Sequence, residues 1–260
     1  MPPPSSGGIA LIQMLNILEN LDIDKFQHNS EEYLMNLISA MDYAFFDRAK
    51  YLGDPDFFNV PQELLISKQY AKDISVKIKN KEELQKIKIT VSESEETTHF
   101  SIVDKWGNAV SNTYTLNTAY GSGIVPTGTG ILMNNEMDDF SSKPGYPNVY
   151  GLIGSEANKI EPKKTPLSSM TPVIVFKEDR PFLVTGSPGG STIITAVLQE
   201  LLNVLDFNMS LSESSKKSKI HFQHLPDIVF YEKLDDETLK SLKTKKRMLQ
   251  RKLGELSLIH

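Results

Sequence analysis

The 260-residue chain contains no cysteine, which excludes disulfide bonds and thiol chemistry and is compatible with either the cytoplasm or the periplasm. No apolar run approaches the ~18 residues of a membrane-spanning helix. Residues 1–8 also lack the basic and apolar regions of a signal peptide. The net charge is only −5, so the overall charge gives no reason to expect a nucleic-acid or membrane partner.

Hydrophobic residues make up 39% of the chain, enough for one substantial core in a globular protein. Apolar residues from Ile9 to Leu21 recur at helical spacing and predict an amphipathic helix. A second helix is predicted from about Glu31 to Lys50, with Ser30 as its N-cap. A third is predicted from Gln62 to Ile78. We expect the first two helices to be packing elements.

A polar, charged segment, Lys79 to Glu96, follows these helices and is predicted to be an exposed linker. It runs directly into alternating apolar and polar residues that begin at Thr97 and continue on both sides of the turn Asp104–Asn108. This pattern indicates a β-hairpin, with Ala109 to Leu116 as its second strand. A linker that ends at a Thr heading a strand predicts cleavage between Glu96 and Thr97.

The side chain of Thr97 is suited to such a cleavage. Its hydroxyl can attack the carbonyl carbon of Glu96 to give an ester, which water then opens. The freed α-amino group of Thr97, with an ordinary pKa near ~8, can act as general base for the same hydroxyl. Taken alone, however, a Thr at the start of a strand is better explained by β-propensity.

Further motifs follow in a specific order and spacing. They are Thr97–Ser101, Asn112–Asn117, Asn134–Phe140, Pro166–Met170 and Gly186–Ser191. Together they closely resemble the bacterial γ-glutamyltransferases, also called glutathione hydrolases. The resemblance runs from about Pro2 to about Asp227.

The resemblance implies an α+β fold, the four-layer αββα sandwich of the N-terminal-nucleophile hydrolases, made as a precursor that cuts itself into two associated subunits. Residues 1–96 would be the C-terminal part of the large subunit, and residues 97–260 the small catalytic subunit, truncated or divergent after about residue 227. Because Pro2–Gly8 resembles a motif deep inside the large subunit, we expect the chain to begin in mid-protein. By resemblance, the parent protein would be periplasmic or secreted.

The resemblance also implies an activity. Thr97 would attack the γ-glutamyl amide of glutathione or a related γ-glutamyl compound. The acyl group would then pass to water or to an amino acid or dipeptide acceptor. No metal or organic cofactor is expected. Thr115 would hydrogen-bond the hydroxyl of the nucleophile and orient it.

The resemblance assigns the binding of the substrate's ammonium group to Asn117, Glu136 and Asp139. The sequence itself places the two acids three residues apart in a turn, where they could converge on a cation or could simply be solvated. The hydroxyls of Ser168 and Ser169 would donate to the substrate's α-carboxylate, although a Ser pair before a strand is also typical of a turn.

The glycines of Gly186–Ser191 precede a helix predicted from about Thr192 to Leu205, and a helix N-terminus offers unpaired N–H groups to an anion. By resemblance, Gly189 and Gly190 form the oxyanion hole. The Gly-Lys-Ser/Thr of a nucleotide-binding loop is absent, which argues against a phosphate site. Tyr150 lies in a Pro- and Gly-containing loop that resembles the family's aromatic lid.

Two features depart from the family pattern. The family's main counter-charge for the α-carboxylate is an Arg upstream of this chain, and it corresponds to none of Arg48, Arg180, Arg247 and Arg251. From Leu239 to Lys252, seven basic residues and no acid predict a basic helix with one solvated face, a reading we prefer to nucleic-acid binding. Alternative hypotheses are an inactive truncated remnant, or a related acylase that would not act on γ-glutamyl anilides.

Overall fold

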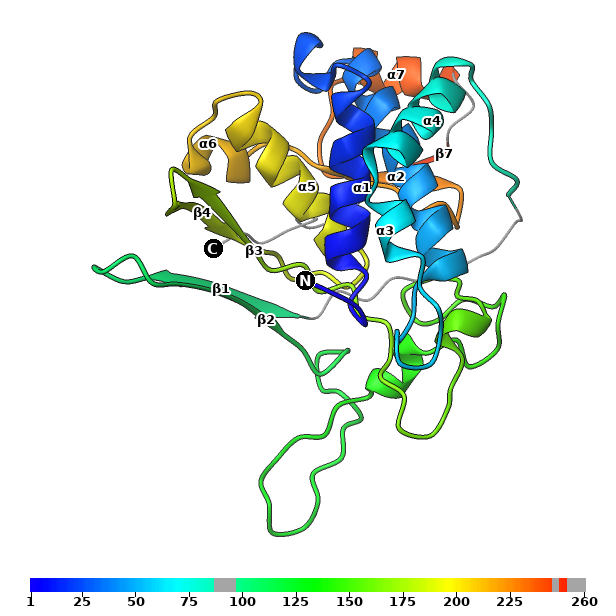
Figure 1. Ribbon diagram of the computed structural model, residues 1–260, viewed down its shortest axis with the longest axis vertical. Helices are drawn as coiled ribbons and strands as arrows, with labels where there is room; N and C mark the ends of the chain where they lie inside the picture. Colours follow the sequence, from blue (N-terminus) through cyan, green and yellow to red (C-terminus); the bar gives the residue numbers. More distant parts are fainter. Residues whose placement is uncertain (87–96, 245–247, 252–260) are drawn as a thin grey trace.

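The computed structural model describes residues 1–86, 97–244 and 248–251 (Figure 1). The helices are α1 (Gly7–Glu19), α2 (Glu31–Tyr51), α3 (Gln62–Leu65), α4 (Lys68–Lys79), α5 (Thr192–Leu205), α6 (Leu211–Ser215) and α7 (Asp236–Thr244), with the 3-10 turns η1 (Ile23–Lys25), η2 (Glu136–Asp139) and η3 (Glu156–Asn158). The strands are β1 (Thr98–Val103), β2 (Ala109–Tyr114), β3 (Val173–Lys177), β4 (Arg180–Thr185), β5 (Ile220–His221), β6 (Ile228–Tyr231) and β7 (Met248–Arg251). In this part of the chain no helix is long and apolar enough to cross a membrane.

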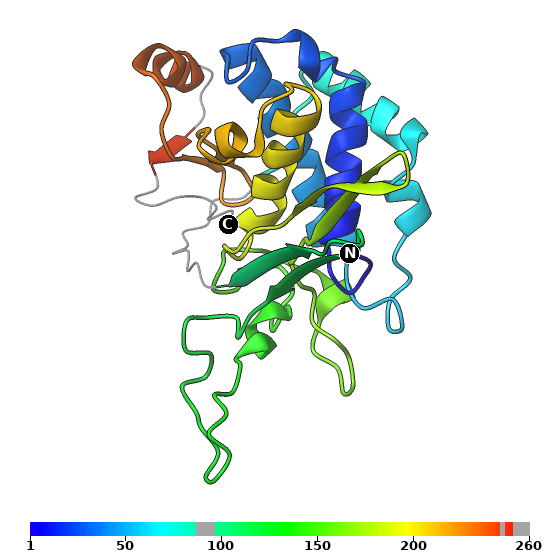
Figure 2. The same cartoon turned by 90° about the vertical axis from the view of Figure 1, so that its left-hand side faces the viewer.

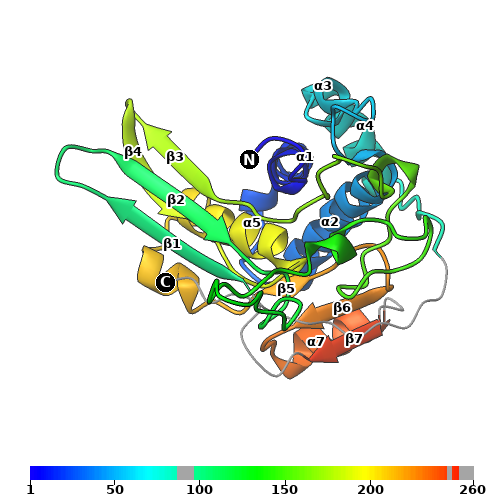
Figure 3. The ribbon, with the colours of Figure 1, turned by 90° about the horizontal axis from the view of Figure 1, so that it is seen from below.

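The strands of the described residues form three small sheets. The hairpins β1–β2 and β3–β4 are both antiparallel and lie side by side (Figure 3). In the third sheet, β6 pairs antiparallel with β5 and parallel with β7. After β2 the chain runs out in a long loop that extends away from the helices before it returns to η2 (Figures 1 and 2).

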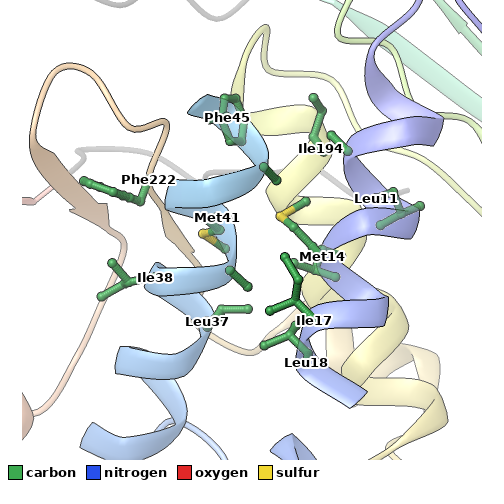
Figure 4. Packing of buried hydrophobic residues seen from close by; sticks show 14 of the residues in the cluster. Leu11, Met14, Ile17, Leu18, Leu37, Ile38, Met41, Phe45, Ile194 and Phe222 are labelled. Atoms are coloured by element: carbon green, nitrogen blue, oxygen red, sulfur yellow. The ribbon is translucent and has the colours of Figure 1, made fainter. Parts of the chain in front are cut away.

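The hydrophobic core joins segments on both sides of residues 87–96. Helix α1 packs against both α2 and α5 (Figure 4). Met14 and Ile17 of α1 are fully buried in one cluster with Leu37 of α2, Ile194 of α5 and Phe222. The apolar face of α1 that the sequence predicts is therefore buried against elements from both parts of the chain.

Charged groups also join the two parts. The Lys86 ammonium lies 3.1 Å from Asp42 Oδ2 and 2.7 Å from Asp227 Oδ1. His224 Nδ1 is 2.7 Å from the other oxygen of Asp42. The Lys86 ammonium also lies 4.4 Å from the ring centre of Phe222, in a cation–π contact. The end of the first described segment is thus held to α2 and to the chain after β5.

Three of the predicted helices are confirmed, and a fourth is corrected. Helices α1, α2 and α5 match their predicted ranges closely, and Ser30 caps α2 by accepting a hydrogen bond of 3.3 Å from Tyr33 N. The helix predicted from Gln62 to Ile78 is broken into α3 and α4. The break occurs because the Ser67 side chain accepts from Tyr70 N at 3.1 Å and caps a new helix.

The predicted basic helix over Leu239–Lys252 is wrong in its extent. Helix α7 begins earlier and ends at Thr244, and Met248–Arg251 forms β7 instead. This strand pairs parallel with β6 along its whole length. The sequence pattern did not reveal the strand because its partner lies some distance away in the chain, whereas helical spacing is a local signal.

Candidate active site

Thr97 stands immediately before β1, as the hairpin prediction required. The register of the hairpin pairs Thr98 with Tyr114, so Thr97 lies opposite Thr115, the residue just after β2. The Thr97 hydroxyl is 3.4 Å from Thr115 Oγ1, which also accepts a hydrogen bond of 2.9 Å from Asn117 N. Antiparallel pairing therefore brings the two predicted hydroxyls together. Glu96, the other side of the predicted cleavage site, lies outside the described residues.

The Thr97 side chain faces a small cavity of about 20 Å³. Its lining comes from residues far apart in the sequence: Thr97, Thr115, Asn117, Asp139, Tyr150, Leu152, Ser168, Ser169, Met170, Gly190 and Ile193. A space of this size holds about one water molecule. Most of the predicted site residues thus converge on one point. Glu136 and Gly189 do not line the cavity. Glu136 lies in the same turn as Asp139, and Gly189 directly precedes Gly190, and both of these neighbours line it.

Tyr150 closes one side of this cavity. Its side chain is buried, and its hydroxyl donates a short hydrogen bond to the carbonyl oxygen of Asn117. Its ring lies so close to Gly190 that a Cβ atom there would be 2.5 Å from Cε1 of Tyr150. Asn117 itself has a φ of +78° and donates from its amide to Asn135 O at 3.2 Å. The loop tyrosine is therefore packed into the site.

Gly189 and Gly190 precede the N-terminus of α5 with φ values of +122° and +57°, which favour glycine. The Gly189 carbonyl accepts from both the N–H and the hydroxyl of Thr192, at 3.1 and 2.8 Å. In the described part of the chain, the N–H groups of the two glycines donate to no protein acceptor. Unpaired N–H groups beside a helix N-terminus suit a negatively charged oxygen.

The Glu136 and Asp139 carboxyl groups both belong to the turn η2 and lie close enough to shift each other's pKa. Burial raises the pKa of Asp139 to about 8, and the interaction with Glu136 adds to this rise. Burial also raises the pKa of Glu136. Two carboxyls this close cannot both ionise easily, so the pair holds a proton near neutral pH. A cation placed between them would release that proton.

The segment with Ser168 and Ser169 is held against the start of α1. Ser6 donates to the Ser168 carbonyl from its N–H at 2.8 Å and from its hydroxyl at 2.7 Å. The Ser168 hydroxyl oxygen accepts from Met170 N at 3.1 Å, which shapes a local turn. Both serine hydroxyls can still donate, so they are suited to a carboxylate.

Arg48 contacts this site through Ser169, although no sequence motif gave it a role. It is 5% exposed, and it donates from Nε to the Ser6 hydroxyl at 2.9 Å and from Nη2 to the Ser169 hydroxyl at 3.1 Å. The signal that could have found it is helical spacing, because Arg48 falls on the buried face of α2 with Met41 and Phe45. A charged residue on such a face needs polar partners.

His99 is a second residue that the sequence analysis did not single out. Its ring is buried, with Nδ1 2.8 Å from Thr113 Oγ1 and Nε2 3.0 Å from Ser101 Oγ. Burial lowers the pKa of His99. A Cβ atom on Gly186 would overlap this ring. His99 on β1 therefore packs against the start of the glycine loop.

No cluster of three His, Asp or Glu side chains that could hold a metal ion occurs in the described ranges 1–86, 97–244 and 248–251. The groups that converge on the cavity are hydroxyls, carboxyls and backbone N–H donors. Such a set of groups can bind a zwitterion, which carries a positive and a negative charge. It can also stabilise an oxyanion that forms when a Thr hydroxyl acts as the nucleophile.

Comparison with known proteins identifies the family. Residues 1–260 match the family described as gamma-glutamyltranspeptidase. The glutathione hydrolase proenzyme of Escherichia coli K12 is 51% identical over 251 residues, covering 94% of this chain and 43% of that protein. The chain therefore spans less than half the length of this curated relative.

Solved structures agree. The T380A mutant of Helicobacter pylori γ-glutamyltranspeptidase has a TM-score of 0.59 and 51% identity, over 61% of this chain and 86% of that one. A cephalosporin acylase from Bacillus halodurans, 24% identical, shares the fold over 98% of this chain and 44% of its own, with a TM-score of 0.77. The α+β, N-terminal-nucleophile hydrolase class is thereby confirmed. The chain belongs to the gamma-glutamyltranspeptidase family.

Proposed function

We propose that this chain carries the nucleophile and much of the substrate site of a γ-glutamyltransferase that also hydrolyses glutathione. The observation that carries the proposal is the cavity at Thr97, where Thr115, Asp139, Ser169 and Gly190 come from separate segments to one point. No organic cofactor or metal ion is part of the proposed reaction. The substrates are glutathione and related γ-glutamyl compounds, and the acceptors are water, amino acids or dipeptides.

Maturation precedes catalysis in this proposal. The Thr97 hydroxyl attacks the carbonyl carbon of Glu96, the C–N bond between the two residues breaks, and an ester to Thr97 Oγ forms while the hydroxyl proton passes to the released amino group of Thr97. Water hydrolyses this ester, which leaves a carboxylate on Glu96 and restores the Thr97 hydroxyl. Residues 1–96 then end one subunit and residue 97 begins the other, and the two remain associated as a heterodimer.

In the transfer reaction, the freed amino group takes the proton of the Thr97 hydroxyl as the oxygen attacks the γ-carbonyl carbon. The N–H groups of Gly189 and Gly190 stabilise the resulting oxyanion. Collapse of this intermediate releases the amine, which takes up the proton, and leaves a γ-glutamyl ester on Thr97. Water or an acceptor amine then attacks the ester and regenerates the hydroxyl.

The charged ends of the substrate account for the remaining groups of the site. Glu136, Asp139 and Asn117 bind its ammonium group, and Ser168 and Ser169 donate to its α-carboxylate. Each of these charges needs a partner once it leaves water. Tyr150, packed over the cavity, acts as a lid that limits the access of water and so favours transfer to amines over hydrolysis.

Intact mass spectrometry of the purified protein tests the proposal. We expect the wild-type protein to be cut between Glu96 and Thr97, and Thr97→Ala to remain whole. Thr98→Ala is the matched control, because Thr98 is the exposed neighbour on β1 and should be cut normally. The cut protein should release 4-nitroaniline from γ-glutamyl-4-nitroanilide. A Thr97→Ala variant that is still cut at this bond would exclude the proposed nucleophile.

A further inference from the structure

Among the residues that the structure describes, Arg48 is a buried cation without an ion-pair partner. Its guanidinium touches two neutral hydroxyls, those of Ser6 and Ser169, and it forms no ion pair with a carboxylate in the described part of the chain. Asp139 is near enough to favour the charge electrostatically without making such a contact. Burying a charge in this way is costly, so the position is suited to a ligand that supplies a negative charge.

The hydrogen bond to Ser169 has a defined direction. An Arg side chain can only donate, so the Ser169 oxygen accepts from Nη2 and keeps its own proton for another acceptor. No protein acceptor for that proton is found among the described residues. Ser169 is half-buried and lines the cavity at Thr97. Its O–H group is therefore a donor available to a ligand in that cavity.

A hydroxyl group that accepts a hydrogen bond from a cation is polarised, and it therefore donates a stronger hydrogen bond to an anion. We infer that Arg48 is a positioning residue for the substrate's α-carboxylate, acting through the Ser169 hydroxyl that it orients and polarises. This inference rests on the proposed function, since it concerns the same substrate. Arg48 does not correspond to the family's upstream Arg. It acts on the carboxylate indirectly, through the hydroxyl of a serine.

The hydrogen bond from Nε to Ser6 explains why an Arg is required. Ser6 also donates to the Ser168 carbonyl. The fork of Arg48 therefore spans from Ser6, the N-cap residue of α1, to Ser169, and it joins the Ser168–Ser169 segment to α2. A Lys at this position would keep the charge but could not hold both hydroxyls with the same geometry.

Paired ligands that differ only in the α-carboxylate give the test. L-glutamate carries this group and 4-aminobutyrate lacks it, and the corresponding donors are γ-glutamyl-4-nitroanilide and 4-aminobutyryl-4-nitroanilide. We expect Arg48→Gln to reduce the preference for L-glutamate over 4-aminobutyrate in calorimetric binding by about tenfold to a hundredfold, the value of a hydrogen bond to a charged group. The preference in kcat/KM between the two donors should fall equally, mainly through KM.

Lys50→Gln is the control on the same helix, because Lys50 is exposed and should leave both preferences unchanged. Arg48→Lys should show an intermediate preference for L-glutamate, and it replaces Arg48→Gln in the comparison if Arg48→Gln does not fold. In a Ser169→Ala background the Arg48 substitution should have little further effect.

An undiminished preference for L-glutamate in both Arg48 variants would overturn the inference. A wild-type protein that binds L-glutamate but cleaves neither donor would contradict the proposed function, while the binding comparison still decides the role of Arg48.

Discussion

At the scale of single residues, the protonated Asp139 links pH to stability. Its pKa is raised to about 8 in the folded protein from 3.8, chiefly by burial. Because the folded state binds this proton more tightly than the unfolded state, the contribution is present at low pH and is lost as the pH rises through about 8. We expect thermal unfolding between about pH 5 and about pH 9 to show a stability that falls with pH, and Asp139→Asn to flatten this fall. A slope that is unchanged in the variant would mean that Asp139 does not titrate in this range.

Gly190 is a residue at which even one methyl group should matter. A Cβ atom would lie 2.5 Å from the Tyr150 ring, and the φ of +57° is unfavourable for alanine. We expect Gly190→Ala to lower kcat/KM by about tenfold to a hundredfold, from ~1–3 kcal/mol of strain in the proposed oxyanion site. Gly128→Ala is the control, since that glycine has a similar φ of +81° and nothing within 4 Å. Equal losses in the two variants would assign the effect to backbone strain alone.

The site residues differ in how far the sequence could reveal them. Thr97, Thr115 and Gly190 could be predicted, because each stands at a turn or strand end within a specific motif, and the structure brings them to one cavity. Arg48 could not be assigned from motifs, since its role depends on a contact with Ser169 across 121 positions of the sequence. The pKa shift of Asp139 likewise depends on burial by distant segments.

At the scale of elements, α1 shows what burial contributes to stability. Ile17 is fully buried in the core, whereas Ile12 on the same helix is 42% exposed. We expect Ile17→Ala to lower the free energy of unfolding by about 2–5 kcal/mol and Ile12→Ala by less than about 1 kcal/mol. Urea denaturation measures the free energy of unfolding of both variants, which lose the same side-chain atoms. Similar losses at the two positions would contradict the packing of α1 against α2 and α5.

The elements that the sequence predicted well are those whose signal is local. The helical spacing of α1, α2 and α5 and the cap at Ser30 are contained within a few turns of chain. The break at Ser67 was missed because apolar spacing continues across it, although the serine is a good N-cap. Strand β7 was missed because its pairing with β6 is not local.

At the scale of the whole molecule, the core predicts how the protein behaves after the proposed cleavage. The same cluster holds Met14 and Leu37 from before residue 97, and Ile194 and Phe222 from after it. We expect the two pieces of the cut protein to elute together in size-exclusion chromatography at physiological salt, and to separate only in denaturant. Lys86→Ala should leave them together, because the apolar contact between the pieces involves many more buried side chains than the two ion pairs of Lys86. Separation of the wild-type pieces in native buffer would contradict this.

The shared core also has a consequence for assembly. If the chain folds before the proposed cut, each molecule carries both of the resulting pieces, so their association is a first-order process that does not depend on protein concentration. Every piece 1–96 is then matched by one piece 97–260 at any level of expression. Two separately synthesised polypeptides would instead have to meet by diffusion, and each would expose half of an apolar core until they did.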